Sequence, residues 1–244
     1  MRIFVDMDGV LSDFDSHFKS YTDTPPGDFV LSLYKMQENI VGQRVSKDKL
    51  LQTTDLIFWK VISEMPDFWS TMTPIDGFKN LWQSVSAFDP IILTSIPLYP
   101  FVSWQAVLGK RQWIDKFISK HIRMYVTFFD HNYKKTYKHH FCQGLDDILI
   151  DNTPENILAW QKAGGTGILF ENAEQAIKDL KMAFVRLQVQ NEITYWMVIK
   201  NAFKQIFRSS KKEIILGLTD QQLKVIGDLD PEKIQVLRKH GMKL

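Results

Sequence analysis

The stretch FVDMDGVLSDF, residues 4–14, determines how this 244-residue chain folds and where its chemistry lies. An apolar run, Ile3–Val5, leads directly into two carboxylates, Asp6 and Asp8, and then into Gly9. The run predicts a buried β-strand, and the glycine gives the acidic turn after it a flexible exit. Similar acidic strings occur in surface turns and calcium loops, but a calcium loop needs further oxygen ligands and a closing Glu, which do not follow here. The pattern therefore predicts two functional acids at a strand end.

Four further apolar runs, rich in β-branched or aromatic residues, predict strands at Pro90–Leu93, Met124–Phe128, Ile148–Ile150 and Gly167–Phe170. Helical patterns lie between them, including Trp113–Ser119 and Pro154–Ala163. Pro154 suits the first helical position, and Gly164 suits the C-terminal cap. Strands that alternate with helices predict an α/β fold with a mostly parallel sheet, covered on both faces.

Polar residues follow three of these predicted strands. They are Asp6 and Asp8, Thr94 and Ser95, and Asp151 and Asn152. Open α/β sheets bind ligands at the carboxyl ends of their strands, so we expect these groups to form one site.

A long segment, residues 15–88, separates the first two predicted strands and is too long for a loop. Its aromatic residues recur at helix-compatible spacing: Phe58, Trp59, Phe68, Trp69 and Trp82. We expect a small helical cap here, packed over a core made of residues 1–14 and 89–183. Residues 184–244 have a helical pattern of their own and predict a C-terminal extension.

Composition restricts the classes of protein that fit. Lys and Arg total 30 against 28 Asp and Glu, so the net charge of +2 gives no general reason to expect a polyanionic partner. A single cysteine, Cys142, excludes an internal disulfide, and no stretch approaches the roughly 18 apolar residues of a membrane span. The chain starts in a strand-like run instead of a signal peptide. We therefore expect a cytoplasmic protein with no membrane partner.

The polar strand ends resemble the motifs of the haloacid dehalogenase superfamily, whose fold is a Rossmann-like core. The resemblance makes Asp6 in DMDGV the nucleophile and Asp8 the general acid/base. It makes Thr94 in IILTS the phosphoryl-binding hydroxyl, and Asp151 in DILIDN a ligand of Mg²⁺ together with Asp6 and Asp8. Dehalogenase relatives lack an acid at the position of Asp8, and transport ATPases have threonine there. The resemblance therefore implies a phosphatase or a phosphomutase.

The third motif of the superfamily is a lysine shortly before the fourth motif. Lys134, Lys135 and Lys138 all qualify. We favour Lys138, because its spacing before Asp151 is similar to that in related sequences.

The fourth motif departs from the pattern of many relatives, which have two acids where this chain has Asp151 and Asn152. An amide still orients a carboxylate or a metal-bound water but adds no charge. Glu155 and Asp147 are nearby acids that would compensate, and we favour the simpler interpretation that both are solvated surface charges.

One branch resembles this chain more than the rest of the superfamily: the 5′(3′)-deoxyribonucleotidases, including the deoxynucleoside-5′-monophosphatases of large DNA phages. The similarity covers about residues 1–170 and rests on DMDGVLSDF, FWSTMTPIDGF, ILTSIP, GKRQWIDKF and DILIDNTPENILAWQKAGG, in this order. It implies hydrolysis of (deoxy)nucleoside 5′-monophosphates through an aspartyl-phosphate at Asp6, in a host cytoplasm if the chain is phage-encoded.

Candidate substrate residues follow from the same branch. The resemblance places Phe14 in the base pocket and Lys110 near the phosphate, and Ser95 lies beside the phosphoryl-binding position. Trp59 and Trp69 are candidates because a nucleobase stacks on flat aromatic surfaces, although tryptophan at helical spacing is more commonly core. Several aromatic residues favour a nucleotide over a sugar phosphate, which remains an alternative substrate.

Residues 184–212 hold six basic residues and one acid. Lys200, Lys204, Arg208 and Lys211 recur at helical spacing, beside an apolar face. We favour an amphipathic helix packed on the main domain with a solvated basic face. The alternatives are docking on nucleic acid, a membrane or a partner subunit, and a role as a nucleic-acid-end (3′-)phosphatase or nucleic-acid-binding protein.

Overall fold

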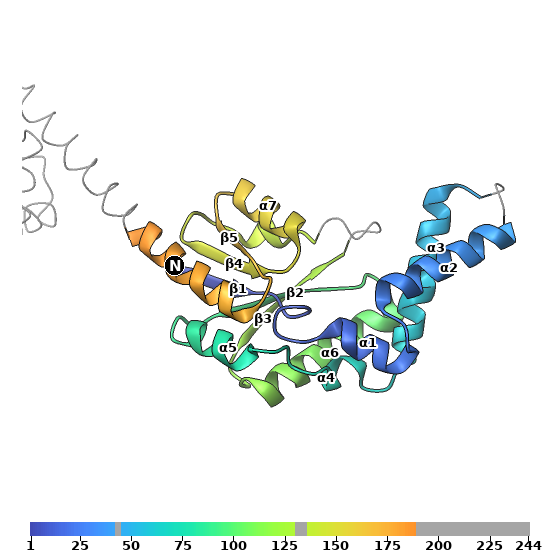
Figure 1. The fold of residues 1–244 in the computed structure, drawn as a ribbon, viewed down its shortest axis with the longest axis horizontal. Helices are drawn as coiled ribbons and strands as arrows, with labels where there is room; N and C mark the ends of the chain where they lie inside the picture. The colour runs from blue at the N-terminus through green and yellow to red at the C-terminus, as the bar shows by residue number, and fades with distance from the viewer. Residues whose placement is uncertain (42–44, 130–135, 189–244) are drawn as a thin grey trace, which may run out of the picture. The chain divides into compact units, whose positions relative to one another are not determined.

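The computed structural model describes residues 1–41, 45–129 and 136–188 (Figure 1). Met1–Leu187 form one compact unit. The boundary predicted at residue 184 falls inside a helix that spans residues 173–188, because Ala183 and Leu187 are both buried in the same core. The basic helix predicted beyond it lies outside the described residues. No helix in the described ranges is long and apolar enough to cross a membrane.

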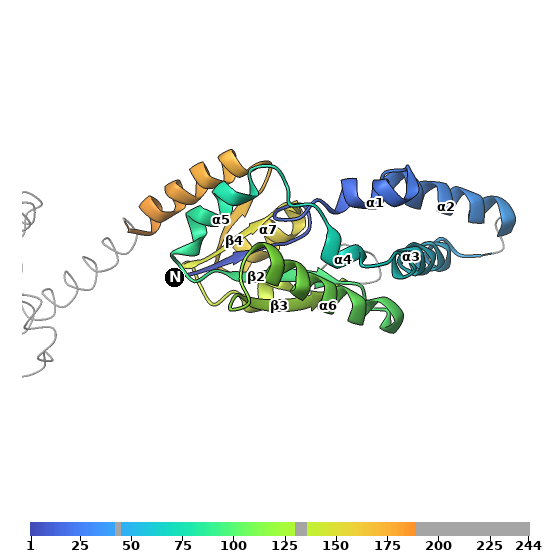
Figure 2. The same cartoon turned by 90° about the horizontal axis from the view of Figure 1, so that it is seen from below.

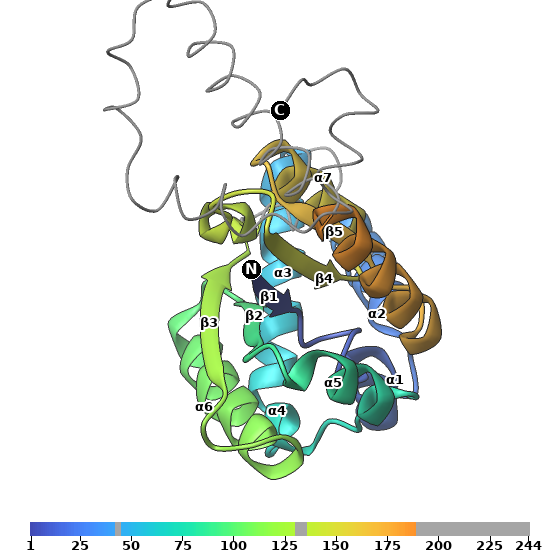
Figure 3. The same cartoon turned by 90° about the vertical axis from the view of Figure 1, so that its left-hand side faces the viewer.

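Five parallel strands form one sheet in the order β3-β2-β1-β4-β5, which confirms the predicted α/β class (Figure 3). The strands are β1 (Arg2–Val5), β2 (Ile91–Ile96), β3 (Arg123–Phe128), β4 (Asp147–Asp151) and β5 (Thr166–Leu169). From β1, the chain adds β2 and then β3 on one side of the sheet. It then crosses back over β1 and adds β4 and β5 on the other side. This reversal makes the carboxyl ends of β1 and β4 the topological switch point, where such sheets bind ligands.

Two predicted boundaries were wrong. β2 continues through Thr94 and Ser95 instead of ending at Leu93, because the Ser95 hydroxyl is bonded to that of Thr127 on β3, at 2.8 Å. The helix predicted from Trp113 is the last part of α6 (Pro100–Phe117). Its start was missed because its outer face leaves Trp104 68% exposed, which obscures the apolar stripe.

Alternate residues of each strand face two separate layers of helices, as the period of two requires. One face, with Phe4 and Leu149, packs against Trp160 of α7 (Pro154–Lys162). The other face, with Val5 and Ile150, packs against α5, α6 and the helix 173–188. Pro154 occupies the first turn of α7, as predicted, and Gly164 follows its C-cap with a φ of 94°.

The segment between β1 and β2 is helical, as predicted. Its helices are α1 (Phe14–Thr22), α2 (Pro26–Val41), α3 (Lys47–Ser63), α4 (Phe68–Thr71) and α5 (Phe78–Ser86). Figures 1 and 2 show α2 and α3 side by side, at the end of this unit away from α5. In contrast, α5 packs with the helices of the sheet, since the ring of Phe78 lies 5.6 Å from that of Trp113. The division into a core and a cap at residues 15–88 stays a prediction.

A glycine allows α4 to lie close to α6. A Cβ atom added to Gly109 would lie 2.5 Å from the Cβ of Trp69. Because that distance is shorter than side chains tolerate, only glycine fits without a shift of backbone. The contact fixes the position of Trp69 against α6.

The turn after β1 is closed by one carbonyl. Met7 O accepts the N–H groups of Leu11 and Ser12 at 2.8 and 2.9 Å. Gly9 has a φ of 77°, and a Cβ there would lie 2.2 Å from the Asn152 amide nitrogen. Gly9 therefore suits both the left-handed backbone and the close approach of the β4 end.

At the opposite end of these strands, Arg2 on β1 is paired with Asp147 on β4. The guanidinium donates to both carboxylate oxygens, at 2.8 and 2.5 Å, and Gln143 N–H donates at 2.6 Å. Burial works to raise the pKa of Asp147, but these donors outweigh it and hold the pKa below its ordinary value. This pair fixes β1 beside β4 and thus the two strands that carry the site.

We predict that Asp147→Asn lowers the free energy of unfolding by about 1–3 kcal/mol at pH 7. The pKa of Asp147 is lower in the folded chain than in the unfolded chain, so the carboxylate stabilises the fold when the pH is above the unfolded-state pKa. This stabilisation is lost as the pH falls through the folded-state pKa. The difference from the unchanged chain should therefore shrink below about pH 4. Urea unfolding at several pH values measures it.

Asp89→Asn is the matched control, since it breaks an exposed Asp–Arg pair with Arg123, at 2.7 Å. We expect it to cost less than about 1 kcal/mol, as exposed pairs do. Equal losses for the two variants, or a loss at Asp147 that does not depend on pH, would contradict this account.

Candidate active site

Lys138 joins the ends of β1 and β4. It begins η2 (Lys138–Phe141), and its ammonium lies 2.7 Å from Asp6 Oδ1 and 2.6 Å from Asp151 Oδ2. All three side chains are buried. The structure thus brings together three residues predicted for the site, and it puts the favoured lysine between the two carboxylates. Lys134 and Lys135, the alternatives, lie outside the described residues.

Burial sets the charge balance of this cluster. It raises the pKa of Asp6 to about 7, an effect that Lys138 opposes and the carboxylates of Asp151 and Asp8 reinforce. For Lys138, burial works to lower the pKa, but Asp151 and Asp6 outweigh it and raise the pKa above its ordinary value. The lysine therefore stays charged, and one cation faces two acids.

Lys110 forms a second buried junction. Its ammonium donates to Asp8 Oδ2 at 2.6 Å, to Thr94 Oγ1 at 2.8 Å and to Ser95 O at 2.8 Å. It also lies 5.0 Å from the ring centre of Trp69, within the range of a cation–π contact. Lys110 is fully buried instead of lying on the surface as most lysines do. Its ammonium contacts Asp8 and the end of β2.

A cavity of about 480 Å³ opens beside these junctions. Its lining includes the polar residues Asp6, Asp8, Ser95 and Lys138 and the aromatic residues Phe14, Phe58, Trp59 and Phe129. Cavities that bind small ligands have this size and this mixture of apolar walls and few polar groups. Thr94, Lys110, Trp69 and Asp151 are not in its lining and support it from behind.

The aromatic wall is a packed cluster. Phe14 begins α1, which is capped by the Asp13 carboxylate accepting the N–H of Ser16. Trp59 stacks on Phe129 and on Trp69, with ring centres 6.2 Å apart in both pairs. Two parallel rings need about 7 Å between them to admit a third, because each face needs roughly 3.5 Å. A ligand ring would therefore lie against the cavity face of the cluster.

Several lining residues were not predicted for the site from the sequence, among them Phe129, Asp15, Thr136 and Asn156. Asn156 donates to both oxygens of Asp151 at 3.0 Å and accepts a short hydrogen bond from the Thr136 hydroxyl. Burial, together with Asp13 and Asp8, raises the pKa of Asp15. The signal for Asn156 was its place in the first turn of a helix that follows a candidate strand end.

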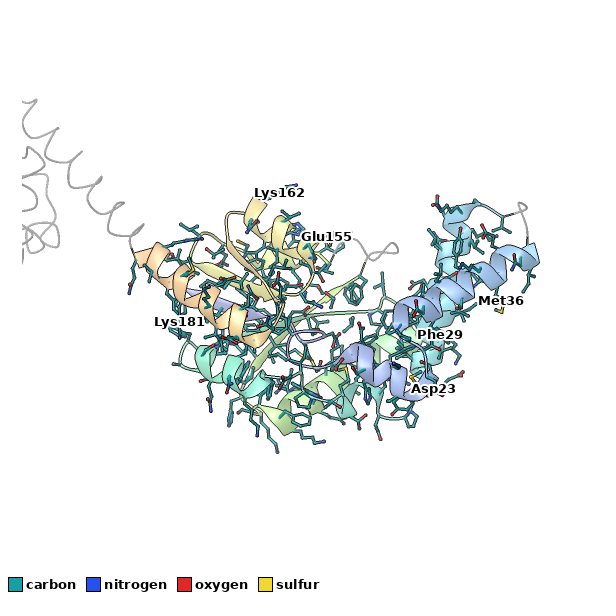
Figure 4. The ribbon with its side chains drawn as sticks, in the orientation of Figure 1. Asp23, Phe29, Met36, Glu155, Lys162 and Lys181 are labelled. Atoms are coloured by element: carbon teal, nitrogen blue, oxygen red, sulfur yellow. The ribbon has the colours of Figure 1, made fainter. Side chains whose placement is uncertain are left out.

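The acids considered as substitutes for a second motif-four carboxylate lie elsewhere. Asp147 is at the far end of β4 and is buried with Arg2, so the interpretation as a solvated surface charge was wrong. Glu155 is exposed on α7 (Figure 4), as expected. Asn152 is also exposed but lines the cavity, where its amide packs on Gly9.

The donor set suits Mg²⁺ in kind, because Asp6, Asp8 and Asp151 supply carboxylate oxygens at one sheet edge. Within the described residues, however, no three acidic, His or Cys side chains converge on a point where a metal would bind. Lys138 and Lys110 hold oxygens of these acids instead. To bind a metal ion, a carboxylate oxygen that now contacts a lysine would have to give up that contact and bind the ion instead.

Residues 1–194 match the family model described as "5′ nucleotidase, deoxy (Pyrimidine), cytosolic type C protein". The chain belongs to this family. The predicted membership of the haloacid dehalogenase superfamily is confirmed with it, and the matched range includes every candidate site residue. This nucleotidase family agrees with the phosphatase class predicted from Asp8.

Solved structures with a similar fold include a predicted phosphatase from Clostridium acetobutylicum, with a TM-score of 0.43 and 11% identity over 75% of this chain and 89% of that one. A HAD-superfamily hydrolase from Ehrlichia chaffeensis gives 0.38 and 11%, over 75% and 97%. The L-2-haloacid dehalogenase from Xanthobacter autotrophicus gives 0.40 and 8%, over 68% and 75%. The nucleotidase assignment rests on the family match alone. A comparison with curated proteins finds none that matches this chain.

We predict that Lys110→Met lowers the free energy of unfolding by about 1–3 kcal/mol, because it leaves Asp8 and the buried Thr94 hydroxyl without their shared donor. Methionine keeps an unbranched apolar stem and removes the ammonium, so the loss of stability reports mainly the contacts of the ammonium. Urea unfolding of the metal-free chain measures it.

Lys116→Met on the same helix is the control. Lys116 is exposed, so its loss should change the stability by no more than about 0.5 kcal/mol. A Lys110→Met chain as stable as this control would show that the buried ammonium does not stabilise the junction.

Proposed function

We propose that this chain is a Mg²⁺-dependent phosphomonoesterase that hydrolyses (deoxy)nucleoside 5′-monophosphates. One observation carries the proposal: the cavity lined by Asp6 and Lys138 is also lined by the aromatic residues Phe14, Phe58, Trp59 and Phe129. The charged residues suit a phosphate ester, and the aromatic residues suit a nucleobase, whose stacking is worth about 1–3 kcal/mol.

The nucleophile is Asp6. Its shortest contacts, with Lys138 and with Met7 N–H, go to Oδ1, which leaves Oδ2 for attack on phosphorus. Attack forms the aspartyl-phosphate and breaks the bond to the nucleoside oxygen, which takes a proton from Asp8. Water then attacks the phosphorus, gives its proton to Asp8, and releases inorganic phosphate and free Asp6.

One oxygen of Asp8 is held by a lysine: its Oδ2 accepts from Lys110 at 2.6 Å. Asp8 Oδ1 accepts only a longer bond from the Ser12 hydroxyl, at 3.4 Å, and is the oxygen we propose for the proton transfer. We propose that Lys110 and Thr94 donate to the phosphoryl oxygens during the reaction, as the family resemblance implies; in the structure both lie behind the lining of the cavity.

Asp6, Asp151 and the main-chain carbonyl of Asp8 are the groups that would hold Mg²⁺. The ion would offset the negative charge that a phosphate adds to a site already rich in carboxylates. Lys138 is the only cation among the described residues that line the cavity, so the protein's own charge does not balance the substrate's.

The family description supports the substrate class, since it names deoxy and pyrimidine nucleotides and a cytosolic type. We propose the same class and a cytoplasmic location for this chain. Phage origin and any contact with nucleic acid through residues 184–212 stay predictions.

The first test is a phosphate-release panel of deoxy- and ribonucleoside 5′- and 3′-monophosphates, sugar phosphates and a 3′-phosphorylated oligonucleotide. We expect kcat/KM for a nucleoside 5′-monophosphate to exceed that for sugar phosphates at least about 10-fold, as one stacked base provides. EDTA should abolish turnover. A preference for sugar phosphates or for the oligonucleotide would replace the proposed substrate by one of the alternatives.

The second test is Asp6→Asn, which keeps the shape of the side chain and removes the nucleophile. We expect kcat to fall by about 10³-fold or more, with the circular dichroism spectrum unchanged. Asp146→Asn, at an exposed acid, is the control and should keep full activity. Comparable turnover by both variants would remove Asp6 from its role.

A further inference from the structure

The outer face of α6 is apolar where a surface helix is usually charged. Phe101, Trp104 and Leu108 recur at spacings of three and four residues and are 38%, 68% and 54% exposed, respectively. Residues 97–109 include no charged side chain, and Gln105, beside this stripe, is polar but neutral. Figures 2 and 3 show α6 at the periphery of the unit formed by Met1–Leu187. An exposed face that is rich in aromatic residues and free of charge has the composition of an interface core.

Charged residues surround the stripe, and they are already paired with one another. At its start, Lys60 of α3 lies 5.9 Å from the centre of the Phe101 ring and pairs with Glu64 at 3.2 Å. Beyond its end, Arg111 pairs with Asp115 on the same helix. An apolar centre inside a charged rim is the usual anatomy of a protein–protein interface.

A groove of about 280 Å³ lies beside the stripe. Its lining includes Gln105, Leu108 and Gln112 of α6, and Met65 and Asp67 from the segment between α3 and α4. The groove is smaller than most sites for drug-sized ligands, and its volume suits one large side chain. Apolar groups beside a carboxylate suit an indole, because its ring is apolar and its N–H needs an acceptor when buried.

We propose that two copies of this chain associate through α6, with Trp104 of each copy in the groove of the other. Antiparallel packing of the two helices about a two-fold axis at the level of Ala106 would put Trp104 of each copy opposite Leu108 of the other. A symmetric dimer requires this reciprocity, in which the same patch serves both sides. A buried tryptophan at the centre of the patch is also the residue type that most often dominates the affinity of an interface.

A second copy fits this surface better than a charged partner does. The stripe offers no charge that would attract one, and the two ion pairs of its rim need no further counter-charge. Two stripes packed on each other would bury apolar side chains from both copies without burying an unpaired charge. The proposal does not depend on the substrate or on a metal ion.

Sedimentation of the full chain over a series of concentrations, without nucleotide, tests the proposal. We expect the average mass to rise with concentration toward twice the mass of one chain. Leu108→Glu should raise the dissociation constant at least about 100-fold, because a symmetric interface would bury the new charge twice. The circular dichroism spectrum should stay unchanged, since the position is exposed in one copy.

Leu158→Glu is the matched control. Leu158 lies on α7 and is 55% exposed, as much as Leu108, so the two variants add the same charge at similar surfaces. We expect Leu158→Glu to associate like the unchanged chain.

Cysteine cross-linking tests the register of the two helices. Gln105 lies next to the proposed axis, so two copies of Gln105→Cys should form a disulfide on mild oxidation. In Gln112→Cys the two new thiols would be about 18 Å apart along the helices, at a rise of about 1.5 Å per residue, and should not react. Cys142 is present in both variants and does not affect the comparison.

Three results would overturn the proposal. The first is a chain that stays monomeric over the whole concentration series. The second is a dimer that Leu108→Glu weakens no more than Leu158→Glu does. The third is a disulfide in Gln112→Cys with none in Gln105→Cys.

Discussion

The buried ammonium of Lys138 is the contact on which the rest of the site depends. Two carboxylates, Asp6 and Asp151, end neighbouring parallel strands and face each other in a place that water barely reaches. Such a pair is costly unless a cation and hydrogen bonds compensate it. Lys138 supplies the charge, and the amide of Asn156 and the N–H of Thr153 supply the hydrogen bonds. In the proposed reaction the same burial serves Asp6, because a carboxylate kept out of water is a stronger nucleophile.

Much of the fold was predictable because its signals are local. Short apolar runs rich in β-branched or aromatic residues identified all five described strands, and the proline of α7 identified a helix start. The boundary of β2 was not predictable, since Thr94 and Ser95 look like a strand end until their buried partners are known. Those partners, Lys110 and Thr127, come from other elements. Polar residues inside a strand are accommodated by tertiary contacts that the sequence does not display.

The candidate site divides in the same way. Asp6, Asp8 and Asp151 were predictable from their positions at strand ends, and Lys138 was favoured over Lys134 and Lys135 only through the resemblance to related sequences. Phe129 was not, because it reaches the cavity only through the sheet order that puts β3 beside β2. Trp69 was placed in the substrate pocket by its residue type, but it lies behind Trp59 and Phe14, where the close contact at Gly109 holds it. Residue type identifies an aromatic cluster, and packing decides which faces are open.

The pair of Arg2 and Asp147 spans 145 residues of the chain and has a consequence for the order in which the molecule is made. During synthesis the N-terminal strand emerges long before the partner strand that compensates its charges. A β1 that paired with β2 alone would bury Asp6 before Lys138, its buried cation, is in place. Parallel pairings of such long range are slow to form and leave strand edges open in the meantime. The candidate site is therefore complete only after β4 has formed, because it combines residues from the first and the last thirds of the described chain.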